Sequence, residues 1–162
     1  MKGAHRFFPL FVDIAGKSVL IVGGGKVALR RVRTLLQFDV HIHIIAENVH
    51  DELETLAGEY RGKVSVERRL FRGGDCWGQP SFGRPFFVIA ATDRRDLNRA
   101  IASECTARNI PVSVADCKEE STFYFPATAA TDTIVAGICS GGNDHGAVKA
   151  AATKIREAIG SP

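Results

Sequence analysis

The chain has 162 residues, of which 45% are hydrophobic, and its formal net charge is +3. This composition predicts one core-forming domain with a short appendage and argues against disorder. The chain contains no dense basic run, no stretch of about 20 apolar residues and no apolar signal-peptide core, so we expect a cytoplasmic protein without a nucleic-acid or membrane partner.

Apolar runs of strand length alternate with amphipathic stretches along most of the chain. The predicted strands cover residues 18–22, 40–45, 64–68, 87–91 and 112–115, and the predicted helices cover 27–38, 50–60 and 96–108. Residues 72–85 hold four glycines and two prolines without periodicity, which predicts a loop that could cover a ligand. The alternation predicts an α/β fold: a Rossmann-like parallel sheet flanked by helices.

The pattern changes after residue 116. Two β-like runs, 122–126 and 133–139, precede Ser140-Gly-Gly142 and an alanine-rich helix over 146–159. Two strands and one helix bury little surface alone, so this region must pack on the first domain or on a second copy of the chain. We expect a dinucleotide-binding domain at 1–116 and a C-terminal dimerisation region at 117–162, in a homodimer.

The first predicted strand runs directly into a glycine-rich turn. Gly23, Gly25 and Ala28 have dinucleotide-fingerprint spacing: the first permits the turn, the second lets a phosphate approach, and the alanine lets the helix pack on the strand. The helix would present free N–H groups to a pyrophosphate, although a purely structural glycine turn stays open. The expected cofactor contacts here are Gly23, Gly24, Gly25, Lys26, Val27 and Ala28.

Further candidates follow the other predicted strands. Glu47 lies about where the fingerprint places a carboxylate for the ribose of NAD, which favours NAD over NADP; a solvated loop carboxylate is the alternative. Ala90, Ala91 and Thr92 end the fourth strand and could reach the nicotinamide half. Asp116 follows the fifth strand, where it is either a proton acceptor or a turn cap.

The cysteines and histidines have no metal-site spacing. The four cysteines are Cys76, Cys105, Cys117 and Cys139. They form no CxxC pair, so we expect reduced thiols and no zinc site. His41 and His43 share one side of a strand, but the sequence offers them no carboxylate or cysteine partner, which favours packing over metal binding.

Six motifs occur in a specific order along essentially the whole chain. They are Phe8-Pro-Leu-Phe-Val-Asp13, Val22-Gly-Gly-Gly-Lys-Val-Ala28, Ala90-Ala-Thr-Asp93 with Leu97-Asn98, Val112-Ser-Val-Ala-Asp116, Phe123-Tyr-Phe-Pro-Ala127 and Ser140-Gly-Gly142. In this order they resemble the siroheme synthase N-terminal domain family. The resemblance implies a precorrin-2 dehydrogenase, in which NAD⁺ takes a hydride to give sirohydrochlorin and the C-terminal region forms an intertwined homodimer that holds the tetrapyrrole.

The resemblance also implies roles for single residues. Asp116 matches the aspartate proposed to remove the accompanying proton, and in bifunctional members the same residue assists Fe²⁺ insertion by a ferrochelatase activity. The resemblance leaves open whether this chain handles Fe²⁺. Ser140 matches a serine near the tetrapyrrole and is a candidate substrate contact; an ordinary turn serine is the alternative. His145 is the second candidate substrate contact, as a proton carrier or a transient metal contact; an inert loop histidine is the alternative. Arg94 and Arg95 are candidate substrate contacts or solvated charges.

A second class of function also fits the glycine turn and Glu47. A noncatalytic NAD-sensing regulatory module would bind the dinucleotide without turnover, but it does not account for Asp116 and the motifs that follow. A short-chain dehydrogenase is weaker, because Tyr60 and Tyr124 have no lysine four positions on. The sequence does not select among siroheme, haem and corrinoid as the fate of the product.

Overall fold

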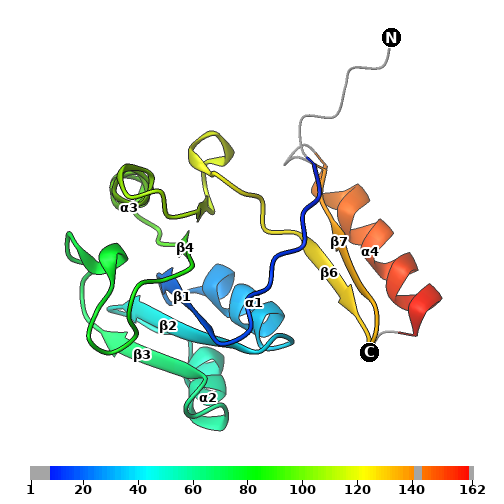
Figure 1. Cartoon of the computed structure of the whole chain (residues 1–162), viewed down its shortest axis with the longest axis horizontal. Coiled ribbons are helices and arrows are strands. Elements are labelled where there is room, and N and C mark those ends of the chain that lie inside the picture. The colour runs from blue at the N-terminus through cyan, green and yellow to red at the C-terminus, as the bar shows by residue number, and fades with distance from the viewer. Residues whose placement is uncertain (1–7, 141–143, 161–162) are drawn as a thin grey trace. The chain divides into compact units, whose positions relative to one another are not determined.

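The computed structural model describes residues 8–140 and 144–160. These residues form two compact units (Figure 1). The sheet unit comprises Ile14–Phe123, and the hairpin unit comprises the described residues up to Asp13 and from Tyr124 onward. Residues 121–122 are hydrogen-bonded to the last strand of the sheet, so the chain leaves the sheet unit only after Phe123.

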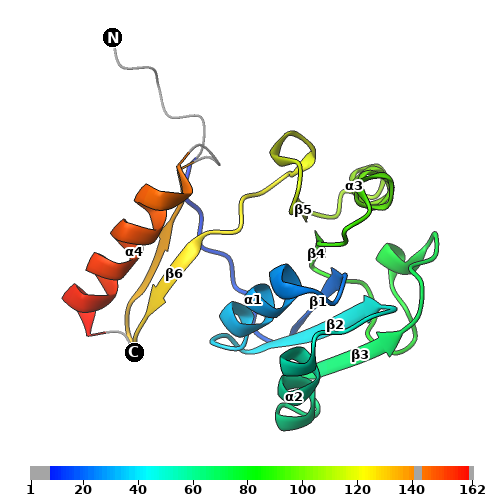
Figure 2. The ribbon, with the colours of Figure 1, turned by 180° about the vertical axis from the view of Figure 1, so that it is seen from behind.

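A five-stranded parallel sheet forms the centre of the sheet unit. Its strands are β1 (Lys17–Val22), β2 (Val40–Ala46), β3 (Val64–Arg68), β4 (Phe87–Ala90) and β5 (Val112–Val114). They lie in the order β3-β2-β1-β4-β5, and Figure 2 shows β1, β2 and β3 side by side. The strand order reverses between β1 and β4, which is where open α/β sheets bind their ligands. This arrangement confirms the predicted Rossmann-like fold.

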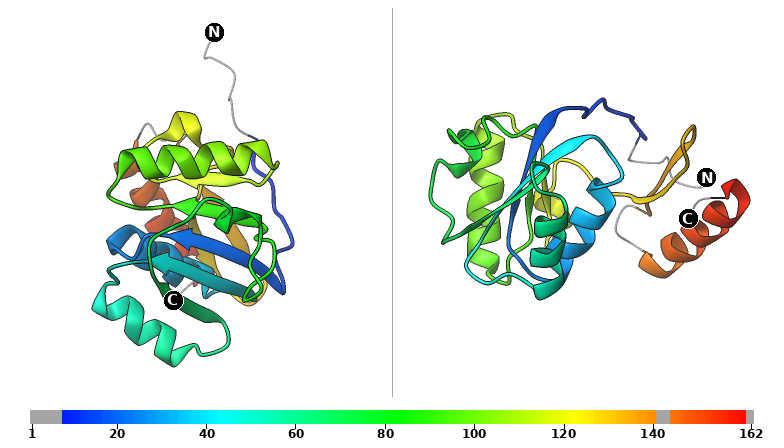
Figure 3. Two further views of the ribbon diagram at one scale, coloured as in Figure 1. Left: turned by 90° about the vertical axis from the view of Figure 1, so that its left-hand side faces the viewer. Right: turned by 90° about the horizontal axis from the view of Figure 1, so that it is seen from below.

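Three helices cover the two faces of this sheet. They are α1 (Lys26–Leu35), α2 (Asp51–Glu59) and α3 (Arg95–Ala107). In Figure 3, α1 and α2 lie on one face and α3 lies on the other. Strand residues such as Val19 and Ile89 are therefore buried from both sides, which explains why the strands are nearly continuous apolar runs.

The buried face of α1 differs slightly from the predicted one. Leu29 and Val32 are buried as expected, but the third buried leucine is Leu35, and Leu36 is only partly buried. The helix ends at Leu35 rather than at residue 38, because the chain turns there and the Phe38 N–H donates to the Leu35 carbonyl.

The predicted loop at 72–85 packs against the rest of the sheet unit. It contains the short 3₁₀ turn η1 (Asp75–Trp77). Glu104 on α3 accepts hydrogen bonds from the backbone N–H groups of Gly74 and Cys76 at 3.0 and 3.2 Å. Cys76 and Phe82 are buried in the core. This segment therefore contributes to packing.

The hairpin unit consists of one β-hairpin and one helix. β6 (Ala127–Ala130) pairs in antiparallel fashion with β7 (Val135–Ile138), and α4 (His145–Ile159) lies along them (Figure 1). Arg156 of α4 donates to the Thr128 carbonyl at 2.8 Å. The Asp144 carboxylate accepts from the Ala147 N–H at 2.8 Å and begins α4.

The predicted strand at 122–126 is wrong, whereas the run at 133–139 contains β7. Thr122 is instead bonded to Val112 of β5, its N–H donating to the Val112 carbonyl at 2.8 Å. Pro126 has no N–H for a ladder, and proline is confined to strand ends and edges. The strand therefore begins at Ala127. No helix in the described part of the chain has the length and apolar character needed to cross a membrane.

Candidate functional site

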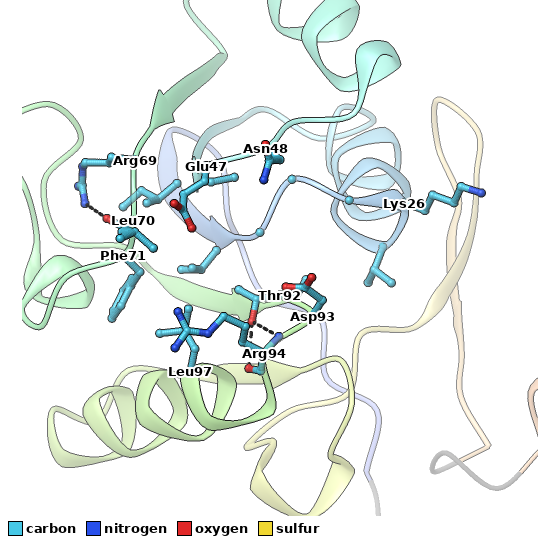
Figure 4. A pocket seen from close by; sticks show the side chains of 18 residues that line it. Lys26, Glu47, Asn48, Arg69, Leu70, Phe71, Thr92, Asp93, Arg94 and Leu97 are labelled. Carbon is cyan, nitrogen blue, oxygen red and sulfur yellow. Dashed lines mark hydrogen bonds between the residues drawn. The ribbon is translucent and has the colours of Figure 1, made fainter.

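A pocket of about 420 Å³ lies at the carboxyl ends of the strands in the sheet unit (Figure 4). Its lining residues are 22–27, 45–48, 69–71, 91–94 and Leu97. The structure thus brings together most of the cofactor contacts predicted from sequence. Ala28 and Ala90 do not line the pocket; both are fully buried beside it. No residue of the 72–85 segment lines this pocket, so the predicted loop does not cover it.

Gly23 is required by the close approach of two strands. Its φ of +114° is a conformation that glycine adopts readily and other residues do not. A Cβ atom at this position would lie 2.3 Å from the Ala91 carbonyl oxygen. Glycine therefore lets the backbone after β1 pass directly beside the end of β4, at the floor of the pocket.

Gly24 and Gly25 have different surroundings. A Cβ on Gly24 would lie 2.3 Å from the Asn48 carbonyl oxygen, and the Gly24 carbonyl accepts from the His50 N–H at 2.9 Å. Gly24 therefore allows the β2–α2 loop to pack on the turn. A Cβ on Gly25 would meet nothing within 4 Å, so the space beside this residue is open.

The N-terminus of α1 can hold an anion at this open space. Gly25 is the N-cap and forms no side-chain cap, and the first turn of α1 contains no acidic residue. The first backbone bond of the helix is Leu29 N–H to the Gly25 carbonyl at 3.0 Å. Helix-terminal N–H groups and the helix dipole favour a phosphate at such a position.

Charged side chains lie at two sides of this turn. In Figure 4 the Glu47 carboxylate points into the pocket, whereas the Lys26 side chain extends away from Glu47 and Thr92. Lys26 therefore lines the pocket without directing its ammonium group into it. The Glu47 position fits a hydrogen bond to a ribose hydroxyl.

Asn98 holds the turn between β4 and α3. It is fully buried, and its Oδ1 accepts from the Thr92 N–H and hydroxyl at 3.1 and 2.7 Å. Its Nδ2 donates to the Thr92 carbonyl at 3.0 Å. Sequence reasoning included Asn98 in a motif but gave it no role; the signal was a polar residue on the buried face of a predicted helix.

The exit of β3 was not predicted as part of the site. Arg69, Leu70 and Phe71 line the pocket directly after this strand. Ligands bind at the carboxyl ends of parallel strands, and β3 is one of these strands. The same rule that pointed to the ends of the other strands therefore points to these three residues. The Arg69 guanidinium is paired with Asp75 and Glu67, and the hydrogen bond to Asp75 is the main reason why its pKa is raised.

Asp116 is exposed in the turn after β5 and does not line the pocket. Its carboxylate forms no hydrogen bond within the described residues, and the 3₁₀ turn η2 (Lys118–Glu120) has Cys117 as its N-cap. Asp116 is therefore not a cap. Arg95 donates to Glu120 at 2.5 Å, and the Asp116 charge contributes to raising the Arg95 pKa, after this hydrogen bond and other charges.

The two predicted substrate contacts lie in the hairpin unit. The Ser140 hydroxyl accepts from the Asp144 N–H at 3.0 Å, and His145 is the exposed first residue of α4. Ser140 is thus bonded to the N-cap residue of the helix that His145 begins. Gly141 and Gly142 of the same motif lie outside the described residues.

The histidines and cysteines form other contacts. His43 bonds to the Ser65 hydroxyl at 2.6 Å and stacks on Phe82 at 4.5 Å. A hydrogen bond to Cys105 and burial raise the pKa of Cys76, which disfavours its reactive thiolate. Among the described residues, no group of three His, Cys, Asp or Glu side chains is arranged to hold a metal ion.

Comparison with known proteins gives consistent matches. The family described as "Putative NAD(P)-binding" matches residues 10–127. The chain is 40% identical over 151 residues to the "Probable multifunctional siroheme biosynthesis protein HemA" of Ruminiclostridium josui, covering 93% of this chain and 28% of that protein. It is 31% identical over 137 residues to the siroheme synthase of Nitrosococcus oceani, covering 85% of this chain and 28% of that protein.

A solved structure has the same fold. The chain described as "SirC, precorrin-2 dehydrogenase" matches with a TM-score of 0.71 and 22% sequence identity, covering 94% of this chain and 71% of that one. The present chain spans 28% of the length of the curated relatives given above.

Proposed function

The chain belongs to the family described as "Putative NAD(P)-binding", and we propose that it is an NAD-dependent dehydrogenase that oxidises precorrin-2 to sirohydrochlorin. The observation that carries this proposal is the pocket in which the open Gly25 position, the N-terminus of α1 and Glu47 meet. The names of the relatives, siroheme synthase and precorrin-2 dehydrogenase, supply the substrate class.

The residues of the pocket suit the parts of a dinucleotide. The N–H groups at the start of α1 bind the pyrophosphate, and Glu47 accepts hydrogen bonds from the adenosine ribose. Thr92, held by Asn98, lies at the end of β4, where the nicotinamide half belongs. NAD⁺ supplies the hydride acceptor when it is bound.

Asp116 is the base in this proposal. Hydride loss from the substrate is accompanied by proton loss, and an exposed carboxylate without a hydrogen-bond partner in the described structure is available to accept that proton. Arg95 places a positive charge near Asp116, because the two charges interact. A positive charge there attracts an anionic substrate.

The proposed partner is a second copy of this chain. Phe8, Leu10 and Phe11 are 88%, 75% and 71% exposed, and Ile134 and Val135 in the hairpin are also exposed. Large apolar side chains gathered in one small unit indicate an interaction surface. Ser140 and His145, in the same unit, are the proposed substrate contacts of the dimer.

Turnover by the purified protein tests the enzyme assignment. Precorrin-2 and NAD⁺ are supplied anaerobically, and the absorbance of NADH and sirohydrochlorin is followed for wild type, Asp116→Asn and the exposed control Asp51→Asn. We expect kcat to fall by about 10²–10⁴-fold for Asp116→Asn alone, because a positioned base contributes that much. The dissociation constant of NAD⁺ should not change.

The same assay separates the alternatives. Wild-type protein that binds NAD⁺ but forms no NADH would contradict the dehydrogenase and favour the regulatory module. Supplying sirohydrochlorin and Fe²⁺ directly tests the ferrochelatase: siroheme formation above the spontaneous rate, lost in Asp116→Asn, is the expected result for a bifunctional enzyme.

A further inference from the structure

Arg69 is placed where an arginine could change the cofactor preference of the pocket. β2 and β3 are paired in parallel with Ala46 opposite Arg68, so Glu47 and Arg69 directly follow the ends of neighbouring strands. Both line the pocket. In dinucleotide-binding folds, an acidic residue at this position binds the 2′-hydroxyl of NAD, whereas a nearby arginine accommodates the 2′-phosphate of NADP. This chain has both residue types, Glu47 and Arg69, at the side of the pocket formed by the ends of β2 and β3.

The guanidinium of Arg69 is already occupied. Its Nε donates to Glu67 at 2.8 Å, and Nη1 and Nη2 donate to the two oxygens of Asp75 at 2.7 and 3.0 Å. Nη1 also donates to the Leu70 carbonyl at 3.1 Å, as Figure 4 shows. These bonds use four of the five N–H groups of a guanidinium. A bidentate contact to a phosphate would require breaking at least one of these bonds.

Asp75 is held more firmly than a surface carboxylate. It is 4% exposed, and it also accepts hydrogen bonds from the Arg72 N–H at 2.7 Å and from Gln79 Nε2 at 3.2 Å. Moving Arg69 toward a ligand would leave this buried charge without its counterion, which is strongly unfavourable. Arg69 therefore stays with Asp75 when a ligand enters the pocket.

The other cations that line the pocket lie elsewhere. Lys26 extends away from Glu47, and Arg94 lies beside Thr92, where it pairs with Asp96 at 3.1 Å. Glu47 is consequently the charged side chain that faces the ribose with no bonded counterion among the described residues. A phosphate at that position would meet the negative charge of Glu47 beside an arginine, Arg69, that is already bonded to two carboxylates.

We propose that Asp75 and Glu67 withhold Arg69 from the dinucleotide, so that the pocket accepts the 2′-hydroxyl of NAD⁺ at Glu47 and rejects the 2′-phosphate of NADP⁺. Asp75 is thus a positioning residue that determines specificity through Arg69. This inference rests on the proposed dinucleotide function. Glu47, Arg69 and Asp75 are the residues that select between the two cofactors.

Calorimetric titration with NAD⁺ and with NADP⁺ tests this proposal without turnover. Wild type should bind NAD⁺ at least about tenfold more tightly than NADP⁺. Glu47→Ser should weaken NAD⁺ binding and leave NADP⁺ binding weak, because Arg69 is still occupied. Glu47→Ser combined with Asp75→Asn should gain about tenfold or more in NADP⁺ affinity over Glu47→Ser, because the freed guanidinium binds phosphate.

Two further variants keep the test decisive. Asp39→Asn removes an exposed carboxylate that pairs with Lys63, and it should change neither affinity. If Asp75→Asn prevents folding, as circular dichroism would show, Glu67→Gln in the Glu47→Ser background frees Nε alone and should give a smaller gain for NADP⁺.

The proposal is overturned if wild type binds both dinucleotides equally, or if the folded double variant binds NADP⁺ no better than Glu47→Ser. A wild-type protein that binds neither dinucleotide contradicts the proposed function instead, so the two failures are distinguishable.

Discussion

The turn after β1 contains three adjacent glycines, and a different physical reason favours glycine at each position. Gly23 has a positive φ and a carbonyl against its Cα, Gly24 packs under the β2–α2 loop, and Gly25 faces open space. Gly23 and Gly24 are thus needed by the protein itself. Of the three, only Gly25 has no packing contact at its Cβ position, and it lines the pocket, where the open space can hold a ligand.

Alanine substitutions separate these reasons. Gly24→Ala should lower the free energy of unfolding by about 1–3 kcal/mol, because a Cβ would be pressed against the Asn48 carbonyl. Gly25→Ala should lower it by less than about 1 kcal/mol, the usual loss at an N-cap. It should nevertheless weaken NAD⁺ binding by about tenfold or more, because the methyl group enters the phosphate space.

Urea denaturation and calorimetric titration with NAD⁺ measure both effects in the same preparations. Each variant serves as the control for the other. Normal NAD⁺ affinity in a folded Gly25→Ala protein would rule out a phosphate at this turn.

At the level of elements, His43 of β2 contacts both β3 and the 72–85 segment. The imidazole bonds to Ser65 of β3 and stacks on Phe82. Burial lowers the pKa of His43 below its ordinary value; the nearby His41 adds to this decrease, and Glu67 opposes it. The neutral imidazole is therefore the form that these contacts favour.

This lowered pKa predicts how stability depends on pH. The unfolded chain takes up the His43 proton first as the pH falls, because the folded-state pKa is below the unfolded value of about 6.5. The stabilising contribution is complete above that pH and is lost as the pH falls toward the folded-state pKa. Denaturation midpoints measured between pH 5 and 8 should show this slope in wild type and in His145→Gln, and a smaller slope in His43→Gln. An unchanged slope in His43→Gln would contradict the assignment.

At the level of the whole molecule, the two units differ in how much they bury. The sheet unit has a continuous core of strand and helix residues. Within the described residues of the hairpin unit, only Ala129 and Ala152 are buried, while Phe8 and Phe11 are highly exposed. Two strands and one helix with so small a core are insufficient for independent stability. A second copy of the chain would cover this surface.

Sedimentation analysis tests that assembly. The wild-type chain should sediment as a dimer, and Phe11→Asp should raise the dimer dissociation constant by about tenfold or more, since buried aromatic residues dominate interface energies. Tyr60→Ser changes an exposed aromatic residue of the sheet unit and should leave the dimer intact. A wild-type protein that sediments as a monomer at micromolar concentration would contradict the homodimer.

Much of the fold follows from local patterns. The five predicted strands and the three helices between them are all present in the sheet unit, with ends shifted by a few residues. The six-motif resemblance is confirmed by the matches to siroheme synthases. The strand predicted at 122–126 was wrong. Its apolar residues are typical of a strand, but the hydrogen bond from Thr122 to β5 depends on residues that are distant in sequence.

The sequence by itself determined the sheet, the glycine turn and Glu47, because hydrophobic periodicity and residue spacing act over a few neighbouring positions. Only the tertiary structure decided which side chains complete the pocket. Asn98 binds Thr92 through hydrogen bonds, and Arg69 is paired with Asp75. Both contacts form only when the strand ends meet at one edge of the sheet. Such pairings depend on three-dimensional distance, so spacing along the chain did not reveal them.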